Sequence, residues 1–192
     1  MSVDTTARQR SDARQNAERI LDAAISCFGR GATATMQDIA QQAELGRVTV
    51  YAHFSTRAVL VERALATAIE RGDALLEASV NGDDDPIAAL RRLVEVSWEL
   101  SAASANLWTA AVEELGAARV RELHGRPAQR VERLLSRGQR AGVFRADLDS
   151  TWLVGSLHAF MKLALDEVSH DRLPRDHAAD LIITSTLALW RN

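Results

Sequence analysis

Residues 35–57, which read TMQDIAQQAELGRVTVYAHFSTR, contain two short helical patterns separated by a few residues. The first pattern begins after Thr35, a good N-cap residue, and places apolar side chains at helical spacing through Ala43. The period is interrupted at residues 44–46, where Gly46 can adopt backbone angles that other residues resist. The second pattern, residues 47–54, is too short to bury a core alone. This segment therefore has to fold as part of a larger helical unit.

Two short helices around a glycine-containing turn are typical of a helix-turn-helix, whose second helix enters the major groove of DNA. At 100° per residue, Val50 and Phe54 lie on one side of the second helix and should pack against the helix that precedes the motif. Four side chains then point away, toward a groove: Val48, Thr49, Ala52 and His53.

The same stretch resembles the DNA-binding domain of TetR-type transcriptional regulators, whose recognition helix ends in a Tyr-x-His-Phe signature, here at residues 51–54. The likeness continues upstream through residues 19–24 and covers about the first third of the chain. The remainder resembles the family only in length and helical pattern. Three positions depart from the family pattern: Glu44 stands for a common glycine, Val48 for a small residue and Arg57 for the usual lysine.

The resemblance implies a set of phosphate contacts that fix the register of the protein on DNA. These residues are Thr49, Tyr51, His53 and Arg57. Thr35 is expected to offer its hydroxyl and nearby backbone N–H groups to a further phosphate. Arg47 is the candidate for base reading, because its planar fork can bond a guanine edge in two places, and Val48 suits a thymine methyl. A solvated surface role for Arg47 and a plain half-buried role for Tyr51 are the alternatives.

Composition indicates an all-α protein in a reducing compartment. Of 192 residues, 47% are hydrophobic but only 5% are aromatic, which is typical of aliphatic, helix-rich packing. The 3 Pro and 10 Gly are too few for the many turns of a many-stranded β fold. The single cysteine, Cys27, excludes an internal disulfide. No apolar run approaches the ~20 residues that span a bilayer, and the N-terminus lacks a signal-peptide core. We therefore expect a cytoplasmic protein without membrane contact. Because the net charge is −3, the attraction to DNA phosphates must come from arginines placed near the helix-turn-helix and not from the overall charge.

The pattern of turns predicts a flexible N-terminal arm over residues 1–13 and a helix-turn-helix DNA-binding domain over 14–57. A helical ligand-binding and dimerisation domain follows over 58–192. The break at residues 81–86 restarts a helix at Pro86. The predicted helices are 14–29, 35–43, 47–54, a long fourth helix from Ser55 or Thr56 through Val80, and then 86–103, 105–115, 118–141, 149–169 and 176–190.

A regulator of this kind needs a homodimer on a palindromic operator, since one short recognition helix buries too little for operator specificity. The resemblance implies that the last two helices of each subunit form a four-helix interface. The expected interface residues are Trp152, Leu153, Leu157, Phe160, Leu181, Ile182 and Leu189. An ordinary intramolecular core is the alternative for the same side chains.

The resemblance also implies a small-molecule effector that shifts the protein between conformers with different affinity for the operator. Candidate pocket residues are largely apolar and would suit an apolar or aromatic ligand. They are Trp98, Trp108, His124, Leu135, His158 and Met161. Each of these side chains has simple core packing as its alternative.

Two other functions stay open at this point. A helical small-molecule-binding module that lost its operator would carry the same patterns. A metal-dependent enzyme would need ligands from Cys27 and the five histidines, but no His-x-x-x-His, Cys-x-x-Cys or Glu-x-x-His pair is present. No glycine-rich phosphate loop follows a strand either. We therefore predict a transcriptional regulator, most often a repressor in this family, with no enzymatic activity, no metal and no cofactor.

Overall fold

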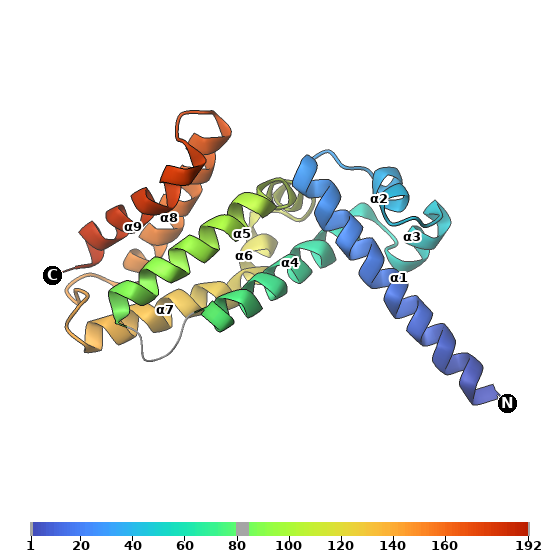
Figure 1. Ribbon diagram of the computed structural model, residues 1–192, viewed down its shortest axis with the longest axis horizontal. Helices are drawn as coiled ribbons and strands as arrows, with labels where there is room; N and C mark the ends of the chain where they lie inside the picture. The colour runs from blue at the N-terminus through green and yellow to red at the C-terminus, as the bar shows by residue number, and fades with distance from the viewer. Residues whose placement is uncertain (1, 80–84, 192) are drawn as a thin grey trace. The chain divides into compact units, whose positions relative to one another are not determined.

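The computed structural model describes residues 2–79 and 85–191. Within these residues the fold is all-α, as predicted, and the only β pairing is an isolated bridge between Phe144 and Arg191. The helices in chain order are α1 (Ser2–Arg30), α2 (Met36–Gln42), α3 (Arg47–His53), α4 (Arg57–Ser79), α5 (Pro86–Leu115), α6 (Ala117–Leu123), α7 (Gly125–Arg140), α8 (Ser150–Ser169) and α9 (Arg175–Trp190) (Figure 1).

The chain forms two compact units. The first comprises the chain through Ala68 together with Ser104–Leu123, and the second comprises Ile69–Ala103 and the chain from His124 onward. Helices α4 and α5 each contribute residues to both units. The sequence predicts a different boundary, between residues 57 and 58, which separates a DNA-binding domain from a ligand-binding and dimerisation domain. That functional division stays a prediction.

The first unit places α2 and α3 beside the C-terminal half of α1 (Figure 1). The apolar stripe of α1 is buried, as its helical spacing predicts. Buried side chains from α2, α3 and α4 complete the interior of this unit. The largest fully buried side chains of this unit are Phe28, Ile20, Ile39, Leu60, Leu65 and Leu107.

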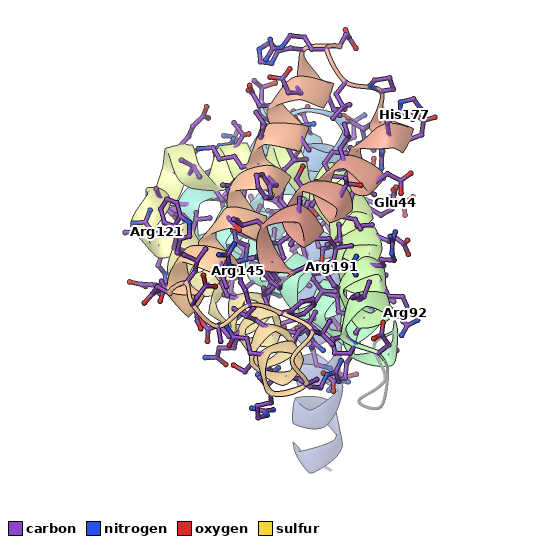
Figure 2. The ribbon with its side chains drawn as sticks, turned by 90° about the vertical axis from the view of Figure 1, so that its left-hand side faces the viewer. Glu44, Arg92, Arg121, Arg145, His177 and Arg191 are labelled. Atoms are coloured by element: carbon purple, nitrogen blue, oxygen red, sulfur yellow. The ribbon has the colours of Figure 1, made fainter. Side chains whose placement is uncertain are left out.

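The second unit is built around one apolar cluster to which α5, α7, α8 and α9 contribute, and α8 and α9 run side by side (Figure 1). Trp190 is fully buried, and its indole N–H lies 3.1 Å from the carbonyl oxygen of Leu153. Its ring meets the edge of Phe144 at 5.5 Å between centroids. The backbone N–H of Arg145 donates to the Trp190 carbonyl at 2.7 Å, and Figure 2 labels Arg145 and Arg191 where these two segments meet. The end of α9 is thus fixed to the connection before α8.

Helices α4 and α7 are joined by a buried arginine within the second unit. The side chain of Arg130 is only 11% exposed and donates to Asp73 and Glu77, each at 2.8 Å. Two acceptors for one guanidinium offset the cost of burying its charge.

Within the described residues, no helix is both long enough and apolar enough to cross a bilayer.

Several predicted helix bounds were wrong. Helix α1 begins at Ser2 and not near residue 14, because residues 2–19 contain no Gly or Pro to stop a helix. Helix α5 is continuous where a break at residue 104 was expected, since the Ser- and Ala-rich stretch there also lacks a helix breaker. The predicted helix 118–141 is divided at His124, just before Gly125. The predicted start at Pro86 is confirmed, whereas Val80 and most of the preceding break lie outside the described residues.

Candidate nucleic-acid interface

The first helix of the motif, α2, begins with a complete capping box. The Thr35 hydroxyl oxygen accepts from the Asp38 backbone N–H at 3.2 Å, and the Thr35 backbone N–H donates to the Asp38 carboxylate at 2.8 Å. The Thr35 hydroxyl also donates to that carboxylate at 2.7 Å. These bonds hold the pKa of Asp38 below its ordinary value. The hydroxyl is therefore engaged in the cap, and its contact with a phosphate stays a prediction.

The turn between α2 and α3 uses a left-handed residue, but not the one that the sequence suggests. Gly46 has ordinary angles, φ −67° and ψ 144°, and serves as the N-cap of α3. The left-handed residue is Glu44, with φ 53°, at the position where the resemblance leads us to expect glycine. Its N–H donates to the Gln41 carbonyl at 3.1 Å, and the Leu45 N–H donates to the Ala40 carbonyl at 3.0 Å. This pair of bonds is a Schellman motif, which ends α2 sharply.

Helix α3 buries one side and exposes the other, as its periodicity predicts. Val50 and Phe54 are 0% and 6% exposed. Val48 is 85% exposed, the largest fraction among the exposed large hydrophobic residues, and Arg47, Tyr51 and Ala52 share the open side. Of the remaining predicted contacts, Thr49 and His53 are half-buried.

Arg47 and Tyr51 form a pair one helical turn apart on this open side. The guanidinium carbon of Arg47 lies 5.5 Å from the centroid of the Tyr51 ring, within the range of a cation–π contact. The contact limits the positions that the long arginine side chain samples. The α3 surface therefore presents a planar donor group, an aromatic hydroxyl and an apolar side chain together, which is the chemistry that base edges and phosphates require.

Arg57 differs from the other predicted DNA contacts because its guanidinium is turned into the protein. Its Nε donates to Glu114 Oε1 at 2.7 Å, Nη1 donates to the Ala34 carbonyl, and Nη2 donates to the Ala32 carbonyl at 3.3 Å. Its guanidinium carbon lies 5.2 Å from the centroid of Phe28. These bonds favour a role inside the motif over the phosphate contact that the resemblance implies.

The predicted effector residues are divided between the two units. Trp98 and Leu135 are 1% and 0% exposed and belong to the core of the second unit, where the Trp98 indole N–H donates to the Arg175 carbonyl at 3.2 Å. Trp108 belongs to the first unit. Met161 is half-buried against the core. The burial of Trp98 and Leu135 favours the alternative, core packing, and their contact with an effector stays a prediction.

His124 and His158 are the predicted effector residues that the structure brings together. Their ring centroids are 5.9 Å apart in an edge-to-face arrangement, and both rings are half-buried. Burial lowers the pKa of His124 to about 4, and the neighbouring His158 adds to this effect. Burial also lowers the pKa of His158, against the opposing charge of Glu132. Both imidazoles are therefore neutral at pH 7, and each ring has one donor and one acceptor nitrogen.

Two pockets open on the first unit beside α1 and α2, with volumes of about 360 and 580 Å³. Both include Gln42 and Glu44 in their lining, and none of the six predicted effector residues lines either one. Among the described residues, no group of three or more His, Cys, Asp or Glu side chains is placed to hold a metal ion.

The predicted dimer residues divide into two sets. Leu153, Leu157 and Ile182 are 0–2% exposed and pack in the core of their own chain, which favours the alternative role given for them, and their place in an interface stays a prediction. Trp152 and Leu181 are 69% and 50% exposed. The half-buried remainder consists of Phe160 and Leu189.

Sequence reasoning missed Leu163, which is 56% exposed on α8. The signal was available in the spacing. Trp152, Gly155, Ala159 and Leu163 recur every three or four residues on α8 and are all exposed. We call these four residues and the exposed Leu181 on the neighbouring helix α9 the α8–α9 face.

The family model for bacterial regulatory proteins of the tetR family matches residues 20–64, which include α2, α3 and the buried stripe of α1. Two relatives from Pseudomonas putida, the HTH-type transcriptional regulator TtgR and the probable HTH-type transcriptional regulator ArpR, are each 33% identical over 90 residues. That match covers 45% of this chain and 43% of each relative.

Solved structures extend the likeness of fold to nearly the whole chain. A transcriptional regulator from Saccharomonospora viridis in complex with choline has a TM-score of 0.81 at 22% identity, over 93% of this chain and 99% of that one. The TetR-like regulator LfrR from Mycobacterium smegmatis in complex with proflavine has a TM-score of 0.71 at 24% identity, over 91% and 96% of the two chains. Residues 20–64, with the signature of α3, thus match the tetR family of bacterial regulatory proteins, and the chain as a whole resembles solved regulators in fold.

Proposed function

We propose that this protein is a sequence-specific DNA-binding regulator that acts as a homodimer on a palindromic operator and responds to a small molecule. The observation that carries the proposal is the exposed side of α3, where Arg47, Val48, Tyr51 and Ala52 stand open on a helix-turn-helix whose opposite side is buried. The two Pseudomonas putida relatives are named as transcriptional regulators. Repression is the mode we propose, inside the cytoplasm, with no catalytic step.

In this proposal Arg47 reads a guanine edge, Val48 contacts a thymine methyl, and Thr35, Thr49, Tyr51 and His53 contact phosphates. The functional division follows the sequence, with DNA binding in residues 14–57 and effector binding with dimerisation in residues 58–192. The exposure of Val48 and the Arg47–Tyr51 contact support this assignment.

The proposed dimer uses the α8–α9 face of each subunit. Trp152, Leu163 and Leu181 are large apolar side chains that are each at least 50% exposed, which is costly for a surface that stays in water. The exposed small residues between them permit the close approach of a partner helix. A two-fold dimer through this face would carry two α3 helices, one for each half-site of a palindrome.

The proposed effector is an apolar or aromatic molecule that carries no charge, or only weakly polar groups, and binds in the second unit. The neutral His124–His158 pair supports this choice, since two uncharged rings offer hydrogen bonds without favouring an anion. Two structures of similar fold were solved with choline and with proflavine, which are the ligands of those proteins.

Fluorescence anisotropy tests the proposal. Labelled duplexes covering the DNA beside the protein's own gene are titrated across a salt series, with a Tyr51→Phe/His53→Ala variant beside the wild type. Saturable binding that survives competitor DNA, weakens with salt and weakens further in the variant is expected. Binding that competitor DNA abolishes would contradict operator recognition, and would favour a ligand-binding module without an operator.

A further inference from the structure

We infer that Arg57 is a positioning residue that closes the helix-turn-helix, and that Glu114 holds it in place. This inference rests on the proposed DNA-binding function and assigns Arg57 a task other than phosphate contact. Its basis is the set of bonds that the Arg57 side chain makes within the first unit, together with the places in the chain that those bonds connect.

The partners of Arg57 lie at the entrance and the exit of the motif. Ala32 and Ala34, whose carbonyls accept from its Nη atoms, form the turn that leads from α1 into α2. Arg57 itself is the first residue of α4, directly after the short turn that leaves α3. One side chain therefore ties the segment before α2 to the segment after α3, so that both ends of the motif are fixed.

The chemistry of the bonds requires arginine. The flat face of the guanidinium covers Phe28, and its edge donates in three directions, to two backbone carbonyls and one carboxylate. A lysine ammonium carries the same charge but has no planar face and no fixed fork. The Arg57 side chain is 29% exposed, so most of its surface is already covered by these contacts.

Glu114 completes the arrangement from a different helix. It lies in the last turn of α5, its side chain is 30% exposed, and its carboxylate accepts from Arg57 Nε at 2.7 Å. The two residues are 57 positions apart in sequence, so the bond is a tertiary one. Without the carboxylate, the guanidinium loses the acceptor that fixes its plane against Phe28.

The inference predicts the opposite sign from simple electrostatics. Removing a negative charge from a DNA-binding protein ordinarily favours DNA binding, because phosphates repel carboxylates. If Glu114 instead keeps Arg57 in place, its neutralisation lowers the fraction of protein with a correctly held α3 and weakens binding. A variant of Glu113, the exposed residue before it, removes the same charge one position away and is the matched control.

The test uses the full-length protein and a labelled duplex recovered from a random-sequence library by the wild type. Glu114→Gln, Glu113→Gln, Arg57→Lys, Arg57→Gln and the Arg57→Lys/Glu114→Gln double variant are titrated by anisotropy over a salt series. Circular dichroism first sets a temperature at which every variant is folded. We expect Glu114→Gln and Arg57→Lys each to weaken binding roughly two- to thirtyfold. The double variant should be no weaker than Arg57→Lys alone, and Glu113→Gln should match the wild type or bind slightly tighter.

The salt series separates the two roles of Arg57. If Arg57 is a positioning residue, Arg57→Gln weakens binding, but its slope of log K against log salt equals that of the wild type. Removing a side chain that neutralises a phosphate instead reduces the slope by about 0.9 per phosphate. That reduction, tighter binding by Glu114→Gln, or full binding by Arg57→Lys would overturn the inference. A wild type that recovers no DNA sequence would overturn the proposed function itself, and this inference with it.

Discussion

Glu44 holds the left-handed position of the turn between α2 and α3, at φ 53°, and its carboxylate lies 3.7 Å from the guanidinium of Arg19 on α1. The same guanidinium donates to the carbonyl of Ala43 at 2.7 Å. The side chains of Arg19 and Glu44 are 42% and 88% exposed, so solvent screens the ion pair and it contributes little. The backbone strain at Glu44 is then the larger effect.

We predict that Glu44→Gly raises the free energy of unfolding by about 0.5–1 kcal/mol. Glycine removes the steric cost of the left-handed region, which exceeds the entropy that glycine adds to the unfolded chain. Chemical denaturation of the wild type and variant measures the difference. Gly142→Ala is the mirror control, because Gly142 has φ 71° at the end of α7 and should lose stability when it gains a Cβ. Lower stability in Glu44→Gly would contradict the argument.

A second prediction concerns the close approach of Phe144 to α7. A Cβ built on Gly138 would lie 2.0 Å from Cδ2 of the Phe144 ring, which is itself packed on Trp190. Gly138→Ala should therefore lower the free energy of unfolding by about 1–3 kcal/mol.

Gly125→Ala on the same helix is the control, since a Cβ there meets nothing within 4 Å, and it should be neutral or stabilising. Thermal unfolding followed by circular dichroism distinguishes them. Equal midpoints for the two variants would show that the Phe144 ring moves aside at no cost.

The third prediction is a dependence of stability on pH through His124. Its pKa in the folded protein, about 4, lies below the ordinary value of 6.5, so the unfolded chain binds the proton more readily. The contribution of neutral His124 to the free energy of unfolding is therefore fully present above pH 6.5. It is lost as the pH falls toward 4, which lowers the free energy of unfolding by up to about 3 kcal/mol. His158 should add to this loss, because burial lowers its pKa too.

Urea unfolding at pH 7 and pH 4.5 measures this change in the wild type and in His124→Gln. The variant should lose less stability on acidification than the wild type does. His177→Gln is the control, because His177 is an exposed residue on α9. The same pH response in the wild type and His124→Gln would show that other groups carry it.

The sequence predicted α3 well, because its two sides differ sharply in hydrophobicity and Val50 and Phe54 mark the buried side without ambiguity. The phosphate contact of Arg57 was predicted from its position directly after the Tyr-x-His-Phe signature, which is a feature of the local sequence. Its actual partners, Phe28 and Glu114, are distant in sequence, so no local pattern reveals them. The roles of the α8 and α9 residues were ambiguous for a related reason. Both helices are apolar on more than one side, and periodicity alone does not say which side faces the core of the same chain.

That ambiguity leads to the fourth prediction, on the dimer. Leu153 and Trp152 are adjacent on α8, yet Leu153 is 0% exposed within the core and Trp152 is 69% exposed on the α8–α9 face. Trp152→Glu and Leu181→Glu should therefore produce a folded monomer, because a charge on this face opposes association but not folding. Leu153→Ala should instead lower the free energy of unfolding by about 2–5 kcal/mol through the cavity it leaves. Light scattering measures the mass and circular dichroism the stability of all three variants. A wild type that is monomeric at micromolar concentration would contradict the interface. If Trp152→Glu and Leu181→Glu both stay dimeric, the interface lies on another surface.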